Sequence, residues 1–295
     1  MMDIVIAYVN GKDPAWQQVY RVVTRKEPAA ERFRDWGTLP FLLRGLAECL
    51  PGIGNVHLVV SDESQVPAWI NRKTVRIVCH KEIIPSRFLP IFNSSSIELF
   101  LHHIPGLAER FVYFNDDMFV MGPCSEEDFF PQGKPRVWCR HFPDPAPGNI
   151  FRLTCRNTYR AACEAAALQP DKGRFLKPQH APSPMLRSVN EQVYRKILPE
   201  ILSSISKIRE EKNINQYLYL CYYWLSGIGH RAPQDFSYLE LGDSLAEILS
   251  AIRDGHRRTI CINDKGVRPG REESTREALL KAFSNRFPDK SIYEL

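Results

Sequence analysis

The chain has 295 residues, of which 44% are hydrophobic and 25% are charged, and its formal net charge is +5. This length and composition suffice to bury a large core in one large or two small domains, and they argue against a disordered chain. The charge is mild and no run of residues forms a basic arm, so nucleic acid is not expected as a partner.

The eight cysteines are scattered without a Cys-x-x-Cys pair, and several lie in apolar runs such as Val75–Cys79. This pattern is typical of reduced, buried thiols and disfavours a disulfide framework. Zinc is also disfavoured, because no pair of cysteines or histidines has ligand spacing. No apolar stretch reaches the ~18–20 residues of a membrane span, and the first strand begins too early for a signal peptide. We therefore expect a cytoplasmic protein that could still lie at the inner membrane through partners.

The first half of the chain alternates short apolar runs with amphipathic runs, which predicts an α/β layer fold. The expected strands cover residues 4–9, Val56–Val60, 75–78 and 110–114. The expected helices cover residues 15–25, a segment that Thr38 caps and that continues to about residue 50, and residues 94–103.

The second half is more helical. Residues 122–148 are rich in proline and glycine and predict a long irregular excursion. Helices are expected over residues 158–167, 185–198, 214–225, 243–253 and 274–283, with one strand over residues 258–262. We expect a single domain over residues 1–295, with sections 1–121, 122–257 and 258–295.

Three expected strands end in short polar clusters, which are Asn10 to Asp13, Asn115-Asp116-Asp117 and Asn263-Asp264. Ligands of open α/β sheets bind at the carboxyl ends of the strands, where the loops converge. Adjacent carboxylates there can hold a hard divalent ion that also binds a diphosphate. A single such cluster is more often a solvated turn, but three of them in one α/β chain favour a nucleotide-sugar site.

Three further residues have both a structural and a functional interpretation. Glu98 lies in the first turns of an expected helix, where it either caps the helix or faces the same pocket as Asp117. His180 lies between two prolines that restrict the direction of its ring, and it is either structural or a general base. Arg209 either belongs to a solvated charged run or binds phosphate oxygens. The aromatic helix that follows, 217–224, fits core packing better than a stacking platform.

In this order, these segments resemble the four sequence blocks of the Stealth proteins. That family includes bacterial capsule and exopolysaccharide phosphotransferases and the animal lysosomal-enzyme N-acetylglucosamine-1-phosphotransferase. The first block resembles residues 3–14, and the second and most specific block resembles residues 32–117. The third resembles Pro178-Gln-His-Ala-Pro182 with Lys207-Ile-Arg209, and the fourth residues 259–264 with Arg286-Phe-Pro288 and residues 291–294.

The resemblance implies a nucleotide-diphosphosugar-transferase-like (GT-A-like) sheet flanked by helices and a set of site residues. Active-site positions of the family fall on Glu98, Asp117, His180 and Arg209. The nucleotide-sugar would contact Asn10, Asp13, Asn115 and Asp264, and a Mg²⁺ or Mn²⁺ ion would bind Asp116, Asp117 and Asp264. The chain departs from the family at Asn10, where many relatives have Asp, and at Thr38-Leu39-Pro40, where Glu-Leu-Arg is usual.

The implied reaction moves a sugar-1-phosphate, such as N-acetylhexosamine-1-phosphate, from a UDP-sugar to a hydroxyl of a polysaccharide or glycan and releases UMP. Such a transfer requires positioning, neutralisation of phosphoryl charge and removal of one proton. His180 is the expected base and Arg209 the expected phosphate ligand, with Glu98 orienting His180 or binding the sugar. Asp117 as base with His180 on the phosphate stays open. The alternatives are a metal-dependent glycosyltransferase that releases UDP and a silent carbohydrate-binding protein.

Overall fold

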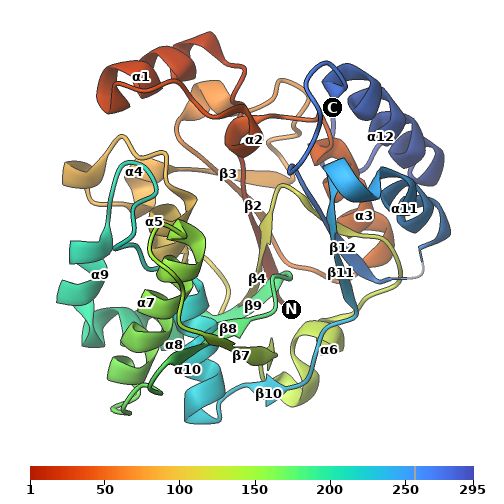
Figure 1. Cartoon of the computed structure of the whole chain (residues 1–295). Helices are drawn as coiled ribbons and strands as arrows, with labels where there is room; N and C mark the ends of the chain where they lie inside the picture. Colours follow the sequence, from red (N-terminus) through yellow and green to blue (C-terminus); the bar gives the residue numbers. More distant parts are fainter. Residues whose placement is uncertain (256) are drawn as a thin grey trace.

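A computed structural model of the chain describes residues 1–255 and 257–295. Its centre is a five-stranded sheet in the order β3-β2-β1-β4-β9 (Figure 1). The strands are β3 (Val75–Cys79), β2 (Val56–Val60), β1 (Asp3–Ala7), β4 (Arg110–Asn115) and β9 (Ser183–Leu186). The first four are parallel and β9 is antiparallel to β4. The carboxyl ends of β1 and β4 therefore meet at one edge, where Ala7 pairs with Asn115.

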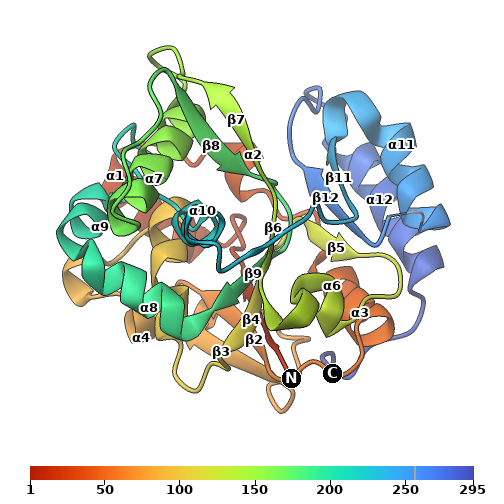
Figure 2. The ribbon, with the colours of Figure 1, turned by 90° about the horizontal axis from the view of Figure 1, so that it is seen from below.

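Alternate residues of each strand pack on opposite faces of this sheet, as the two-residue period of a strand requires. Ile4 and Ile6 pack on the face that is covered by α3 (Leu39–Cys49), α11 (Leu241–Asp254) and α12 (Glu272–Arg286). Val5 packs on the other face, covered by α7 (Ile150–Ala165), α8 (Arg187–Lys196) and α10 (Tyr217–Ser226). Figures 1 and 2 show the two groups of helices on opposite sides of the strands. Both faces are dry, which explains why β2 is buried at all five positions.

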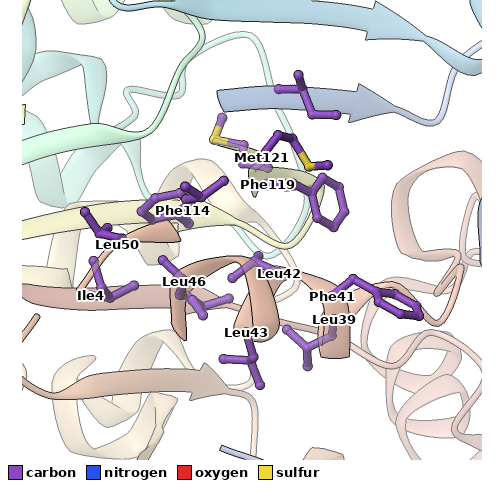
Figure 3. Packing of buried hydrophobic residues seen from close by; sticks show 14 of the residues in the cluster. Ile4, Leu39, Phe41, Leu42, Leu43, Leu46, Leu50, Phe114, Phe119 and Met121 are labelled. Carbon is purple, nitrogen blue, oxygen red and sulfur yellow. The ribbon is translucent and has the colours of Figure 1, made fainter. Parts of the chain in front are cut away.

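Helix α3 packs its leucines closely on the sheet (Figure 3). Leu42, Leu43 and Leu46 are fully buried between α3 and its neighbours. Gly45 allows the close approach, because a Cβ atom at this position would lie 2.4 Å from the carbonyl oxygen of Val120. The helix ends at Cys49, just before Pro51-Gly52, as the sequence predicted.

A second, three-stranded sheet has the order β11-β12-β5 and consists of β11 (Phe236–Glu240), β12 (Thr259–Asn263) and β5 (Met118–Val120). Strand β5 follows β4 directly, so Asp116 and Asp117 form the turn between the two sheets. The backbone N–H of Ile262 donates to the carbonyl oxygen of Asp117 at 2.9 Å. Strand β12 thus returns from near the end of the chain to the Asp116–Asp117 turn.

The prediction that residues 122–148 form an irregular excursion is wrong in part, because this segment contains regular secondary structure. It holds α6 (Glu126–Phe129), β6 (Arg136–Val137) and β7 (Cys139–Pro143). Strand β7 pairs with β8 (Arg174–Pro178), and β6 pairs with β10 (His230–Arg231). These partners lie far along the chain, so local composition gave no sign of them.

The remaining helices also differ from the prediction at particular places. The helix expected over 94–103 is α5 (Ser94–Ile97) followed by the 3-10 helix η3 (Glu98–His103). The helix expected over 185–198 begins at Arg187, because the two residues before it belong to β9, and it is followed by α9 (Leu198–Ser204). The other short elements are α1 (Pro14–Thr24), α2 (Ala30–Phe33), α4 (His80–Ile83), η1 (Glu63–Gln65), η2 (Ser86–Phe88) and η4 (Pro131–Gly133).

The predicted fold class, an α/β sheet flanked by helices with a more helical second half, is confirmed. The division into one domain with three sections stays a prediction, and strand pairs cross both internal boundaries, since β4 pairs with β9 and β5 with β12.

All eight cysteines are buried and free. Among the described residues, no helix combines the length and apolarity that a membrane crossing needs.

Candidate active site

A cavity of about 1150 Å³ opens at the carboxyl ends of β1, β4 and β12. Its lining comes from segments that are far apart in the sequence. Of the residues predicted from the sequence it includes Glu98, Asn115, Asp116, Asp117, His180, Arg209 and Asp264. The fold therefore brings all four expected catalytic side chains to one space.

Asp116 and Asp117 occupy the β4–β5 turn and carry unusual electrostatics. Burial raises the pKa of Asp116 to about 8, with further contributions from the charges of Asp117 and Asp35. Burial also raises the pKa of Asp117 to about 6, against hydrogen bonds from Cys261 and Asn263 and the charge of Arg209. Neighbouring carboxylates that resist ionisation in an empty site gain charge when a cation joins them.

Asp117, His180 and Cys261 each offer one ligand atom, and these atoms all lie within 4.8 Å of one another. One carboxylate oxygen of Asp117, Oδ1, is buried and has no hydrogen-bond partner among the described residues. A buried oxygen without a hydrogen-bond partner lowers the stability of the fold unless a ligand binds to it. Cys261 fits a hard cation poorly, because burial raises the pKa of its thiol well above the ordinary value and the neutral thiol bonds to Asp117 instead.

His180 is held by a short contact with one tyrosine and by the ring of another, Tyr238, whose centroid lies 5.7 Å away. Its Nδ1 lies 2.7 Å from the hydroxyl oxygen of Tyr217, the first residue of α10. Burial lowers the pKa of His180 to about 4, and the positive charges of Lys177 and Arg209 lower it further. The ring is therefore neutral near pH 7 and can accept a proton at the nitrogen that does not carry hydrogen.

Glu98 and Arg209 also line the cavity and interact electrostatically with each other. The hydroxyl of Tyr113 donates to Glu98 Oε1 at 3.2 Å, and Arg209 Nη2 donates to Ser94 Oγ at 3.0 Å. Burial raises the pKa of Glu98 to about 7, whereas the Arg209 charge, the Tyr113 hydroxyl and the backbone N–H of Gln216 lower it. Glu98 is thus poised between its two protonation states near neutral pH.

Asp264 lies in the cavity but is already paired. Its Oδ1 accepts from Arg34 Nη1 at 3.3 Å. Asp116, Asp117 and Asp264, the predicted metal ligands, are not one of the groups whose ligand atoms lie within 4.8 Å among the described residues. The pairing with Arg34 occupies only Oδ1 of Asp264, whereas Oδ2 is buried and has no hydrogen-bond partner among the described residues.

Two predicted nucleotide-sugar residues, Asn10 and Asp13, are not brought to the cavity, whose lining does not include them. Asp13 caps α1 by accepting from the backbone N–H of Ala15 at 2.9 Å, and it accepts from Gln65 at 2.6 Å. Asn10 accepts from the backbone N–H of Lys12 at 3.0 Å. Both side chains stabilise the loop between β1 and α1.

Sequence reasoning did not single out several lining residues. Asp35 accepts a hydrogen bond from the Tyr8 hydroxyl at 2.8 Å. Its negative charge contributes to the raised pKa of Asp116. Arg140 and Lys177 are cross-strand partners on β7 and β8, and both line the cavity. Strands β7 and β8 had no local signal in the sequence. Asp35, in contrast, lies inside the second sequence block and could have been found from its place beside Arg34.

Comparison of the sequence with known proteins shows which family the chain belongs to. Conserved region 2 of the Stealth proteins matches residues 32–137. The exopolysaccharide phosphotransferase cps2G of Lactiplantibacillus plantarum is 30% identical over 330 aligned positions, which cover 99% of this chain and 96% of that protein. The chain belongs to the Stealth family. The receptor polysaccharide phosphotransferase WefC of Streptococcus oralis is 28% identical to this Stealth protein, over 100% of this chain and 99% of that one.

The predicted resemblance and the predicted enzyme class, a phosphotransferase, are therefore confirmed for this Stealth protein. Among solved structures, the galactosyltransferase LgtC in complex with donor and acceptor sugar analogues matches 96% of both chains, at 12% identity and a TM-score of 0.43. That likeness is too distant to carry an argument, so the chemistry of this Stealth protein is argued from its own residues.

Proposed function

We propose that this chain transfers a sugar-1-phosphate, an N-acetylhexosamine-1-phosphate in particular, from a UDP-sugar to a hydroxyl of a growing polysaccharide. The products would be a phosphodiester and UMP, and the setting would be capsule or exopolysaccharide synthesis in the cytoplasm. Relatives that align over nearly the whole chain are named as phosphotransferases of exopolysaccharide and receptor polysaccharide, which supports this class of acceptor.

The main support is the convergence of Glu98, Asp117, His180 and Arg209 on one cavity from four separate segments. Such a convergence of perturbed carboxylates, a neutral imidazole and a guanidinium is expected of a catalytic centre and is unusual for a structural network. The cavity is also large enough for a nucleotide-sugar, since ligand pockets range over about 300–1,000 Å³.

The cavity lining pairs its acidic groups with cations that suit phosphate oxygens. Arg209, Arg140 and Lys177 all line it. A guanidinium forms two parallel hydrogen bonds with phosphate oxygens, and a buried ammonium adds a point charge. These side chains would bind the diphosphate and stabilise charge as the phosphoryl group moves.

The acidic turn fits a divalent cation. Asp117, with its unpartnered Oδ1, and the adjacent Asp116 would hold Mg²⁺ or Mn²⁺. When bound, the ion would offset the negative charge of the donor diphosphate. Asp264 would act through its pair with Arg34, and it need not bind the ion.

His180 is the group best suited to accept the proton of the acceptor hydroxyl. This role requires the tautomer in which Nδ1–H donates to the Tyr217 oxygen, because Nε2 then keeps its lone pair for this proton. The acceptor oxygen forms a bond to the sugar-bearing phosphorus, and the bond from that phosphorus to the UMP oxygen breaks with both electrons going to UMP. Glu98 would orient the acceptor or the sugar from beside Arg209.

The identity of the released nucleotide tests this proposal against an ordinary glycosyltransferase. Purified protein is incubated with UDP-N-acetylglucosamine or a related UDP-sugar, Mg²⁺ and a polysaccharide acceptor, and the nucleotides are separated by chromatography. We expect UMP, and none with the Asp117→Asn variant. Release of UDP would mean that the glycosidic bond was cut and would overturn the proposal. Donor binding without turnover across the donor panel would instead indicate a carbohydrate-binding protein.

A further inference from the structure

A second group of metal-ligating side chains lies outside the cavity. It consists of His102 and His103 at the end of η3 and Glu191 on α8. His102 Nε2 and His103 Nε2 lie 3.2 and 3.1 Å from the same carboxylate oxygen, Glu191 Oε2. None of these three residues lines the cavity.

The hydrogen bonds around His102 decide which of its nitrogens carries hydrogen. The hydroxyl of Tyr219 donates its only hydrogen to the carbonyl oxygen of Leu99 at 2.8 Å. The same oxygen lies 3.4 Å from His102 Nδ1 and can only accept there, so Nδ1 carries the hydrogen. In a neutral ring, Nε2 then presents a lone pair toward the Glu191 oxygen.

His103 is arranged in the same way. In the tautomer that can bind a metal through Nε2, its Nδ1–H donates to the carbonyl oxygen of Ile83, 3.4 Å away. Nε2 of the neutral ring therefore also points a lone pair at Glu191 Oε2. A histidine that donates its other ring N–H to a carbonyl or hydroxyl is the arrangement that orients metal ligands.

With both rings in this tautomer, three lone pairs converge at about 3 Å and repel one another unless a cation lies between them. A proton on His103 would join that ring to Glu191, but it would leave His102 Nε2 without a partner. The side chain of His102 is 1% exposed, and no hydrogen bond joins its Nε2 to any described residue.

We propose that His102, His103 and Glu191 bind a divalent transition-metal ion of the zinc type, separate from the ion at Asp117. Bonds of about 2.0–2.2 Å in a tetrahedron place ligand atoms about 3.3 Å apart, close to the two separations observed here. Two imidazoles and a carboxylate suit zinc and disfavour Mg²⁺ or Ca²⁺. The fourth position is open to water, because His103 and Glu191 are 29% and 31% exposed.

The ion would connect η3 to α8. Arg195 pairs with the other Glu191 oxygen, Oε1, and so holds Oε2 toward the two rings. Helix η3 begins with Glu98 and ends with the two histidines, so the ion would fix the far end of the element that carries Glu98. The site would thereby stabilise the fold without taking part in the transfer.

Co²⁺ is the probe for the test, because tetrahedral Co²⁺ absorbs visible light and replaces Zn²⁺ in such sites. The full-length chain is titrated with Co²⁺ in excess Mg²⁺, which occupies the hard-cation position. We expect one equivalent with a tetrahedral spectrum and a Zn²⁺-dependent rise in Tm. Glu191→Gln and His103→Asn should each weaken Co²⁺ binding by at least about tenfold.

Two matched variants serve as controls. His141→Gln removes a surface histidine that is paired with Asp171 at 3.0 Å, and it should not change Co²⁺ binding. His180→Gln removes a ligand from the cavity group and should also leave the spectrum intact. The proposal fails if wild-type protein gives no tetrahedral spectrum, if Glu191→Gln and His103→Asn bind as wild type does, or if His180→Gln abolishes the signal. Tm measured in EDTA identifies which variants are folded, and either ligand variant suffices for the comparison.

Discussion

The hydroxyl oxygen of Tyr217 lies 2.7 Å from Nδ1 of His180 and leaves Nε2 as the nitrogen available to the cavity. Tyr217 is buried, and its hydroxyl oxygen can accept from Nδ1–H in the tautomer that the proposed base requires. The proposed base therefore depends on a residue that does not touch the substrate.

Removal of the Tyr217 hydroxyl tests whether His180 depends on it to act as the base. Tyr217→Phe should lower kcat by about tenfold or more with little change in KM, because His180 then samples the tautomer that cannot accept a proton at Nε2. The measurement is the initial rate of UMP release at saturating metal, taken across pH. Tyr223→Phe removes a buried hydroxyl from the same helix, outside the cavity, and should retain wild-type kcat. Equal activity of Tyr217→Phe and wild type would remove the positioning role.

Arg209 is expected to act through the shape of its guanidinium as well as through its charge. Arg209→Ala should lower kcat by about 10²–10³, the usual cost of losing one electrostatic group in a catalytic site. Arg209→Lys keeps the charge but not the two parallel hydrogen bonds, so it should recover only part of the activity. Steady-state kinetics with the UDP-sugar donor measure both variants.

Lys212→Ala is the matched control, because Lys212 forms an exposed ion pair with Glu210 three residues beyond Arg209. Its kcat should equal that of wild type. Full activity of Arg209→Lys would mean that a positive charge alone is sufficient at this position.

The raised pKa of Asp116 predicts how the stability of the fold depends on pH in the absence of metal. Its pKa is raised to about 8, mainly by burial, so the folded state holds this proton more tightly than the unfolded state, in which the pKa is about 3.9. The stabilisation is complete below pH 4 and is lost as pH rises through 8. In EDTA, Asp116→Asn should therefore have a higher Tm than wild type at pH 8.5, by about 2 °C or more.

The difference in Tm between Asp116→Asn and wild type should shrink at pH 5.5, where the wild-type carboxyl is protonated. Mg²⁺ should raise the Tm of wild type more at pH 8.5 than at pH 5.5, because binding the ion displaces a proton. Differential scanning calorimetry at both pH values measures these effects. A difference that grows as pH falls would contradict the sign.

The contact between α3 and β5 should be intolerant of added volume. Gly45→Ala would place a methyl group 2.4 Å from the Val120 carbonyl oxygen, so the helix must move. We expect a loss of about 1–3 kcal/mol in the free energy of unfolding, measured by urea denaturation. Ala47→Ser, on the exposed side of the same helix, should change it by less than about 0.5 kcal/mol. Equal stability of the two variants would show that the packing is looser than the distance indicates.

The strands of the central sheet could be predicted because each is a short apolar run between turn signals. The prediction for Val56–Val60 matched β2 residue for residue. By contrast, β7 and β8 were missed, because charged residues interrupt their apolar positions, and their pairing joins segments more than thirty residues apart. Helix-like spacing at 94–103 was read as one α-helix, whereas the turn tightens to a 3-10 helix at Glu98.

The candidate site shows the same division. Glu98, Asp117, His180 and Arg209 were selected from the sequence with the help of the family resemblance, and the fold brings them to one cavity. Asn10 and Asp13 were expected from the resemblance to contact the nucleotide-sugar, but they do not line this cavity. They form hydrogen bonds within the β1–α1 loop instead, and hydrogen-bond partners cannot be read from residue type.

The sequence by itself determined the α/β class, the family and the chemical character of the site, because apolar period and residue type are local properties. Only the tertiary structure decided which polar residues share a space. Spacing along the chain disfavoured zinc, yet folding brings Glu191 within 3.2 Å of two histidines almost ninety positions earlier. Lone pairs interact over distances of a few ångströms in space, and those distances exist only once the chain has packed.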